Sequence, residues 1–240
     1  MIEAVVSDFG GVLTSPLMEG FARIQADTGV PAAAFGVALA RATATDGRNP
    51  LFELEVGAIT EDRFVATLER ELEAGLGRPV ALHGFGERYM AALDPNEALF
   101  AHYRALHERG LRFAMLTNNV REWEPLWRSK LPVDDIFETV VDSGFVGLRK
   151  PDPAIYALVL ERLALPAAAC VFVDDIAVNV EAARALGFAV VHFRDTERAI
   201  AELDALVPAT SARQRPGQPP APAPRAPPPS QLSEPSRSQQ

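Results

Sequence analysis

The feature that most constrains the fold is a regular alternation of short apolar runs with segments of helical period. Five runs have the composition of buried strands: Ala4–Ser7, Phe113–Leu116, Thr139–Val141, Val171–Val173 and Ala189–His192. Between and after them, apolar residues recur at helical spacing over Glu97–Arg109, Asp152–Leu163, Asn179–Leu186 and Thr196–Leu206. Strands that alternate with helices are typical of a parallel sheet covered on both faces. The sequence therefore predicts an α/β fold.

One interval lacks this alternation. From Pro16 to about Leu93 the pattern predicts helices only, at 17–28, 32–43, 60–74 and 84–92, with Thr60 as an N-cap. We interpret residues 16–93 as a helical sub-domain inserted after the first strand. The α/β core then consists of residues 1–15 and 94–208.

The composition changes at Pro208. Half of the chain's 20 prolines lie between that residue and Pro235, and no aromatic residue follows. Such a segment buries too little apolar surface to offset the entropy of ordering, so we predict a disordered Pro-rich tail at 209–240. The run Pro219–Pro229 is a candidate for a weak interaction with a partner domain that binds polyproline. The alternative is a solvated tail with no specific partner.

Charge and cysteine content exclude several classes of protein. The formal net charge of −9 argues against nucleic-acid and anionic-membrane partners. Cys170 is the chain's one cysteine, so no intrachain disulfide can form. The chain runs from Met1 into an apolar strand without a signal-peptide pattern, and no apolar stretch reaches the roughly 18 residues of a membrane span. We expect a cytoplasmic protein.

Polar residues follow the first four apolar runs. These residues are Asp8 after the first run, Thr117 and Asn118 after the second, Lys150 beyond a loop after the third, and Asp174 and Asp175 after the fourth. Ligands in an open parallel sheet bind at the carboxyl edge of the strands. The sequence therefore predicts one site at this edge.

The residue types indicate phosphoryl transfer. An aspartate such as Asp8 can attack phosphorus and form an aspartyl-phosphate. Mg²⁺ prefers oxygen ligands, available here from Asp8, a backbone carbonyl, and Asp174 or Asp175. Thr117 and the amides after it are suited to binding phosphate oxygens, and Lys150 balances the negative charge.

The four segments resemble the haloacid dehalogenase-like hydrolase superfamily in order and spacing. Within it they are most similar to the N-terminal phosphatase domain of soluble epoxide hydrolase and to glucose-1-phosphatase-like bacterial members. The resemblance covers roughly residues 3–206. It implies a Rossmann-like core with a helical cap, Asp8 as nucleophile, Thr117 and Asn118 as phosphate-binding residues, and Lys150 as the catalytic cation. It also implies Mg²⁺ on Asp8, the Gly10 carbonyl and the pair Asp174–Asp175, with Asp175 favoured as the direct ligand.

The chain departs from the family pattern at Gly10. Most phosphatases of the superfamily carry a second aspartate there, which serves as the acid and base for the leaving group and the attacking water. Its absence removes a group whose help is typically worth about 10²–10⁴-fold. We expect substrates with a good leaving group, such as sugar-1-phosphates or acyl phosphates.

Three functions remain open at this point. The first is a Mg²⁺-dependent phosphatase, a phosphoric monoester hydrolase acting on a small phosphorylated metabolite. The second is a weak or silent phosphate-binding protein that lost turnover with the change at Gly10. The third is a phosphotransferase or dehalogenase. Arg121 and Arg149 lie near the site in sequence and are candidates for substrate contacts. Asn179 is expected either to orient the loop of Asp175 or to cap its helix.

Overall fold

Five short strands form one parallel sheet in the order β3-β2-β1-β4-β5. The computed structural model describes residues 1–207. The strands are β1 (Ala4–Ser7), β2 (Arg112–Thr117), β3 (Thr139–Asp142), β4 (Cys170–Asp174) and β5 (Ala189–His192). All five predicted strands are confirmed, three of them one or two residues longer than expected. The register aligns Ser7 with Met115 and Val173, so the ends of the three central strands meet at one edge.

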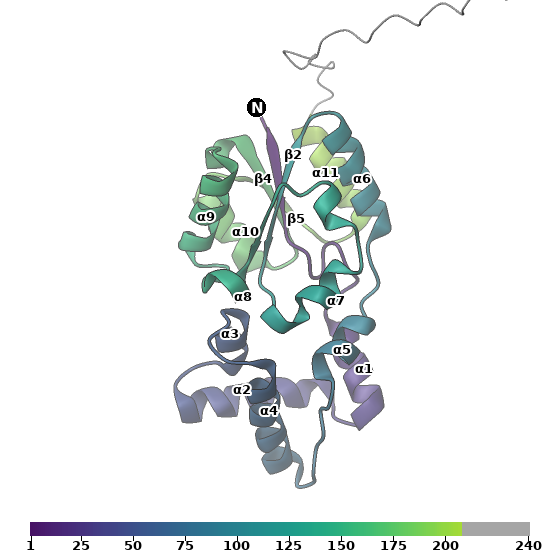
Figure 1. The fold of residues 1–240 in the computed structure, drawn as a ribbon, viewed down its shortest axis with the longest axis vertical. Coiled ribbons are helices and arrows are strands. Elements are labelled where there is room, and N and C mark those ends of the chain that lie inside the picture. The colour runs from purple at the N-terminus through teal and green to yellow at the C-terminus, as the bar shows by residue number, and fades with distance from the viewer. Residues whose placement is uncertain (208–240) are drawn as a thin grey trace, which may run out of the picture. The chain divides into compact units, whose positions relative to one another are not determined.

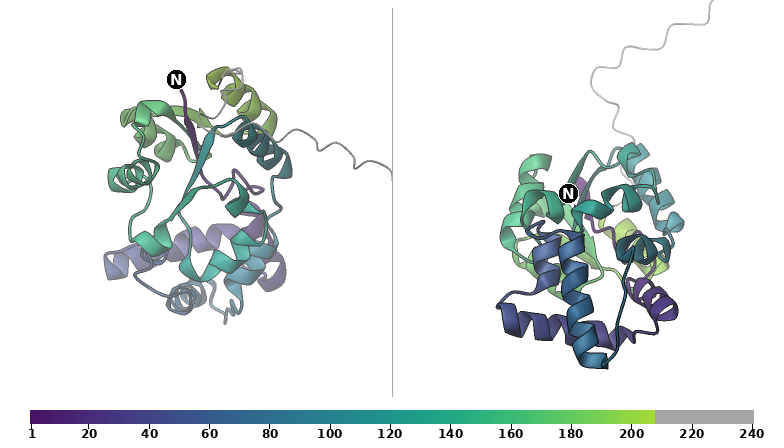
Figure 2. Two further views of the ribbon diagram at one scale, coloured as in Figure 1. Left: turned by 45° about the horizontal axis from the view of Figure 1, so that its top comes forward. Right: turned by 60° about the horizontal axis from the view of Figure 1, so that its bottom comes forward.

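The two faces of the sheet bury alternate residues of each strand under different helices. Val5, Phe113 and Val171 belong to the apolar cluster on the side of α6 (Glu97–Glu108) and α11 (Thr196–Leu206). Val6 and Phe172 belong to the cluster on the side of α9 (Pro153–Leu163) and α10 (Ala177–Ala185). Figures 1 and 2 show these helix pairs on opposite faces of the sheet. This two-residue period is that of a sheet buried on both sides, and it confirms the predicted α/β class.

Five helices fill the interval between β1 and α6. They are α1 (Met18–Thr28), α2 (Ala32–Asp46), α3 (Pro50–Glu55), α4 (Glu61–Leu76) and α5 (Phe85–Ala91). They lie beyond the carboxyl edge of the sheet, in the lower half of Figure 1. Four of them were predicted, and Thr60 caps α4 as expected by accepting a hydrogen bond from the Arg63 N–H.

The sequence analysis missed α3 and the short helices of the core. With six residues, α3 is too short to show helical periodicity. In the core, α7 (Glu124–Arg128) and α8 (Ser143–Val146) are shorter still, as are the 3₁₀ turns at Arg121–Trp123, Val133–Asp135 and Ala167–Ala169. A local signal for α3 was present, because Asn49 accepts from the Leu51 N–H as an N-cap and Pro50 occupies the first turn.

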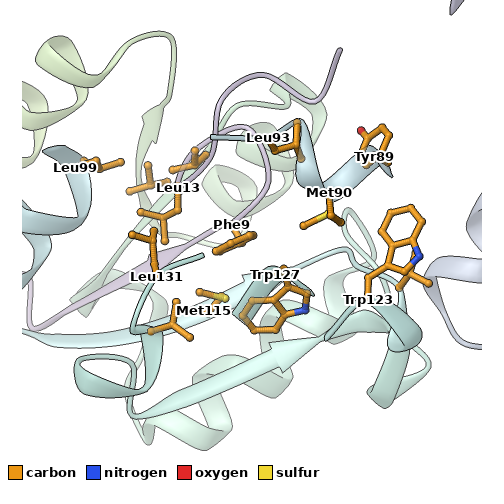
Figure 3. Close-up of a cluster of buried hydrophobic side chains, with 14 of the residues drawn as sticks. Phe9, Leu13, Tyr89, Met90, Leu93, Leu99, Met115, Trp123, Trp127 and Leu131 are labelled. Atoms are coloured by element: carbon orange, nitrogen blue, oxygen red, sulfur yellow. The ribbon is translucent and has the colours of Figure 1, made fainter. Parts of the chain in front are cut away.

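The two chain segments that join the helices α1–α5 to the core run side by side. Thr14 and Pro95 form an antiparallel bridge, and the Ser15 N–H donates to the carbonyl of Asp94. Figure 3 shows Phe9 at the centre of the adjoining apolar cluster, between residues of α5 and Trp127. The Phe9 and Trp127 rings lie 5.1 Å apart, centre to centre. The loop after β1 is therefore packed, through Phe9, against Trp127 and α5.

Two predictions about organisation are not decided by these observations. The boundaries of the helical cap at 16–93 stay a prediction, because residues 1–207 belong to one compact unit. The Pro-rich tail at 209–240 lies outside the described residues. No helix among residues 1–207 combines the length and apolar character needed to cross a membrane.

Candidate functional site

A buried lysine joins two of the predicted acidic residues. Lys150 is 1% exposed, and its Nζ lies 2.6 Å from Asp174 Oδ2 and 3.0 Å from Asp8 Oδ1. Burial opposes the charge on this ammonium group, but the Asp174 and Asp8 carboxylates outweigh it and hold the pKa of Lys150 above its usual value. The predicted nucleophile and the predicted cation are thus in direct contact.

Asp8 directly follows β1 and faces a cavity. Its Oδ1 accepts a hydrogen bond of 2.7 Å from the Phe9 N–H in addition to the contact with Lys150. Burial raises the pKa of Asp8 to about 7; Lys150 lowers it, and the nearby Asp174 and Asp175 carboxylates raise it. Three acidic side chains this close to one ammonium group favour the binding of a further cation.

Asp174 and Asp175 have different surroundings. Both oxygens of Asp174 are hydrogen-bonded: Oδ1 accepts from the Ile176 N–H, Oδ2 from Lys150, and the Asn179 amide donates to both. Asp175 Oδ1 is buried and has no hydrogen-bond partner among residues 1–207. One carboxylate oxygen from each of Asp8, Asp174 and Asp175 lies within 4.8 Å of the others. A divalent cation would satisfy the unpaired Asp175 oxygen, so the acidic cluster fits Mg²⁺.

Asn179 orients the acidic loop. Its side-chain amide contacts Asp174, whereas Ile176 occupies the N-cap position of α10 without a side-chain cap. The first of the two expectations for Asn179 is therefore confirmed. Gly11 lies against Asp175: a Cβ there would lie 2.5 Å from Asp175 Oδ2, and φ at Gly11 is +76°. Only glycine fits there.

Asn118 holds the backbone of Lys150 at two points. Its Oδ1 accepts from the Lys150 N–H at 2.8 Å, and its Nδ2 donates to the Lys150 carbonyl at 3.0 Å. The sequence analysis predicted only a phosphate-binding role for Asn118, and that role stays a prediction. Its side chain is a positioning group for Lys150. Thr117, at the end of β2, is buried and lines the cavity.

The cavity has a volume of about 520 Å³ and lies between the carboxyl edge and helices of the α1–α5 segment. The structure brings most of the predicted site residues to its wall, namely Asp8, Gly10, Thr117, Asn118, Lys150 and Asp175. Asp174 lies behind them, fully buried and outside the lining. Asp175 is therefore the better placed of the pair for direct metal contact.

A second ion pair, missed by sequence reasoning, spans the two parts of the chain. Arg149 Nε lies 2.7 Å from Oε2 of Glu55 on α3, and the guanidinium carbon lies 3.8 Å from the centre of the Phe52 ring. Burial raises the pKa of Glu55, and Arg149 opposes that rise. Arg149 and Glu55 both line the cavity. Arg121 is not part of the lining, and its guanidinium group donates to the Gly144 carbonyl.

Leu17 occupies the space beside Gly10. A Cβ built on Gly10 would lie 3.1 Å from Leu17 Cδ2. The position at which many family members carry the acid/base aspartate is thus covered here by an apolar side chain.

We expect Lys150 and Asp174 to be strongly coupled in stability. Lys150→Met should lower the free energy of unfolding by about 3–5 kcal/mol, because it leaves the buried Asp174 carboxylate without its cation. Adding Asp174→Asn should recover part of this loss. The measurement is urea unfolding of both single variants and the double variant, with chelator present. Lys130→Met removes the chain's other lysine, whose Nζ donates to the Leu93 carbonyl, and should cost much less. The coupling would be contradicted if the loss of unfolding free energy in the double variant equalled the sum of the losses in Lys150→Met and Asp174→Asn.

Asp142, at the end of β3, should make stability depend on pH. Burial raises its pKa to about 6; the hydrogen bond from the Gly144 N–H lowers it, and Oδ2 has no partner among the described residues. A carboxyl with a raised folded-state pKa binds protons more readily folded than unfolded, so its destabilising effect is relieved as pH falls through 6. Between pH 7.5 and pH 5 the parent should gain about 1 kcal/mol of stability relative to Asp142→Asn. Parallel stability curves for the two proteins would contradict this prediction.

Known proteins resemble the chain over most of its described length. Bifunctional epoxide hydrolase 2 from Sus scrofa is 26% identical over 91% of this chain and 41% of its own length. Sesquiterpene phosphatase astK from Aspergillus oryzae is 33% identical over 48% of this chain and 59% of its own length. The chain spans less than half the length of the first curated relatives that it matches. The match covers 9% of acyl-CoA dehydrogenase family member 10 from Mus musculus and 41% of the Sus scrofa protein.

Solved structures share the fold. A HAD family enzyme from Bacteroides thetaiotaomicron, in complex with magnesium and inorganic phosphate, superposes with a TM-score of 0.59 at 21% identity, over 81% of this chain and 95% of that one. An L-2-haloacid dehalogenase superposes with a TM-score of 0.60 at 24% identity, over 79% and 85%. The family model for the haloacid dehalogenase-like hydrolases matches residues 2–187. With the acidic edge, the buried lysine and this match in agreement, the chain belongs to the haloacid dehalogenase-like hydrolases.

Proposed function

We propose that this protein is a cytoplasmic, Mg²⁺-dependent phosphatase that hydrolyses a phosphate monoester of a small metabolite through an aspartyl-phosphate on Asp8. The observation that carries the proposal is the placement of Asp8. It opens onto a cavity, is paired with Lys150 and lies within a cluster of three carboxylates that fits a divalent cation. Nucleophile, cation and metal ligands are the parts that phosphoryl transfer needs.

Asp8 has one oxygen suited to attack. Oδ1 accepts from the Phe9 N–H and contacts Lys150, which fixes the carboxylate plane and leaves Oδ2 to form the bond to phosphorus. As that bond forms, the ester P–O bond breaks and the leaving group departs as an oxyanion that takes its proton from solvent. Water then attacks phosphorus, the bond from phosphorus to Asp8 breaks, and inorganic phosphate and the free carboxylate are released. Thr117 and Asn118 line the cavity beside Asp8, and the Thr117 hydroxyl and the Asn118 N–H are suited to donate to the phosphate oxygens. The N–H groups of Asn119 and Val120 already donate to Ser143 Oγ and Asn119 Oδ1.

Asp8, the Gly10 carbonyl and Asp175 would hold Mg²⁺, with Asp174 behind them. When bound, Mg²⁺ neutralises charge on the phosphate and on the acidic cluster. Asp174 contributes mainly by holding neighbouring groups in place, because its oxygens already accept hydrogen bonds from Lys150, Ile176 and Asn179.

The relatives give independent support. One curated relative is named as a sesquiterpene phosphatase. A structural neighbour was solved with magnesium and phosphate and another is a dehalogenase, but both are under 25% identical, so their likeness concerns the fold alone.

The specific observation behind the alternative is the pair Gly10 and Leu17. With no carboxyl at position 10, the protein could instead bind a phosphorylated metabolite with weak or no turnover. The assays of phosphate release described next distinguish the phosphatase from this binding protein.

Phosphate release should require both Asp8 and Mg²⁺. We expect Asp8→Asn to reduce kcat on p-nitrophenyl phosphate by at least about 10³-fold, because the amide is a poor nucleophile. Chelation should abolish the activity, and added Mg²⁺ should restore it. The measurement is phosphate release by purified protein, with Asp152→Asn as a matched control on an exposed helix cap. Asp8-independent release would contradict the nucleophile. Binding of phosphate without any release would favour the alternative function.

Turnover should depend on the leaving group. Since no carboxyl at position 10 can protonate the departing oxygen, p-nitrophenyl phosphate should be cleaved much faster than glucose-6-phosphate, by about 10² or more in kcat. Equal rates for the two substrates would show that leaving-group control is wrong. A separate assay with a 2-haloacid tests the dehalogenase: halide release there, without phosphate release from the esters, would indicate a dehalogenase.

A further inference from the structure

We propose that the substrate is a hydrophobic phosphate monoester, whose hydrocarbon or aryl group occupies the cavity under helices α1–α5. This inference rests on the proposed function, because it names the substrate class of the same site. It differs from the expectation from the sequence, which gave sugar-1-phosphates and acyl phosphates as examples of substrates.

The wall contributed by the helical segment is almost entirely apolar. Side chains from α1, α2, α4 and α5 converge on it, among them Phe21, Phe35, Leu39, Phe64, Leu68 and Phe85. Several of these rings already pack on one another, with Phe21 and Phe35 at 5.4 Å and Phe35 and Phe85 at 6.2 Å between ring centres. These packed rings form a continuous apolar surface, which favours binding of an apolar group.

The polar groups on this wall already have partners. Of the lining residues within α1–α5, only Glu55 and Tyr89 carry polar side-chain atoms. Glu55 is paired with Arg149, and the Tyr89 hydroxyl donates to the Leu17 carbonyl at 2.9 Å. A sugar bound here would give up its hydrogen bonds to water and find few replacements. A hydrocarbon loses nothing and gains the contact area.

The polarity of the cavity fixes one orientation for such a molecule. Its floor carries Asp8, Thr117, Lys150 and Asp175 from the sheet edge, and its roof carries the apolar wall. A phosphate on the floor directs the ester group toward the roof. The volume of about 520 Å³ lies in the range of pockets that enclose small organic ligands.

Apolar residues also surround the opening. Phe52, Ile176 and Val178 line the cavity and are 44%, 44% and 53% exposed, so they lie where it meets solvent. They come from both parts of the chain, α3 and the loop and first turn of α10. An apolar group too long for the cavity would continue along these side chains.

The test varies apolar length at a constant leaving group. A series of 4-alkylphenyl phosphates from methyl to hexyl keeps the chemistry of the departing oxygen nearly unchanged. We expect kcat/KM to rise by up to about fourfold per methylene until the cavity is filled. Substrates are kept below their aggregation concentrations, and glucose-1-phosphate is the polar comparison. A flat series, or a preference for glucose-1-phosphate, would overturn the proposal.

A binding measurement keeps this result separate from the proposed function. Alkylphosphonates resist hydrolysis, so calorimetric titration from methyl to octyl reports on the cavity without turnover. Affinity that rises with length, with an increasingly negative heat-capacity change, supports the hydrophobic site even if no substrate is hydrolysed. Hydrolysis of p-nitrophenyl phosphate together with length-independent phosphonate binding overturns the hydrophobic site and leaves the phosphatase intact.

Two variants on the same helix localise the effect. Leu39 on α2 lines the cavity, whereas Val37, two residues earlier, is 54% exposed and outside the lining. Leu39→Gln should flatten the dependence on alkyl length and reduce kcat/KM for the hexyl substrate by about tenfold or more, with little effect on the methyl substrate. Val37→Gln should leave the series unchanged. Thermal unfolding of both variants verifies that they are folded. Identical series for the two variants would refute the assignment of the cavity.

Discussion

The contact on which the site depends is the buried ammonium group of Lys150 between Asp8 and Asp174. The sheet places β1 beside β4, so two carboxylates arrive at neighbouring strand ends and would repel each other without a cation. Lys150 reaches them from a loop after β3, and Asn118 at the end of β2 holds that loop by both backbone groups of Lys150. Lys150 therefore connects the ends of four strands, two through its ammonium group and two through its backbone and loop. This charge also keeps Asp8 oriented, through the same Oδ1 that accepts from the Phe9 N–H.

The core and the helical segment contribute different things to the same cavity. The sheet edge supplies the charged and hydroxyl groups, and helices α1–α5 supply an apolar wall. The ion pair between Arg149 and Glu55 connects the two, and Arg149 is the neighbour of Lys150 in sequence. The ion pair between the two parts of the chain is therefore formed by the residue next to the reactive lysine.

The sheet-edge residues could be predicted from the sequence because parallel strands impose their convergence. Once Ala4–Ser7 and Val171–Val173 are recognised as neighbouring strands, Asp8 and Asp174 must lie near each other. No such rule governs the helical segment, where Glu55 and the cavity wall depend on how five helices pack. Helix α3 is also too short to show a period. The two hydrogen bonds from Asn118 to the backbone of Lys150 could not be predicted either. The sequence shows only that an amide side chain follows a strand, and not which group that side chain contacts.

Gly10 and the apolar cavity have a common physical explanation. A carboxyl group at position 10 would lie against Leu17, beside a roof with few free hydrogen-bond partners, where an ionised group is costly. Such a group would have its pKa raised and would need a polar neighbour that the roof lacks. Glycine avoids this cost and leaves apolar contact up to the edge of the phosphate site. The loss is proton transfer to the leaving group, which matters least for oxygens that depart without protonation, such as phenolate. An aryl phosphate therefore satisfies both the hydrophobic wall and the missing acid, whereas an alkyl phosphate satisfies only the wall.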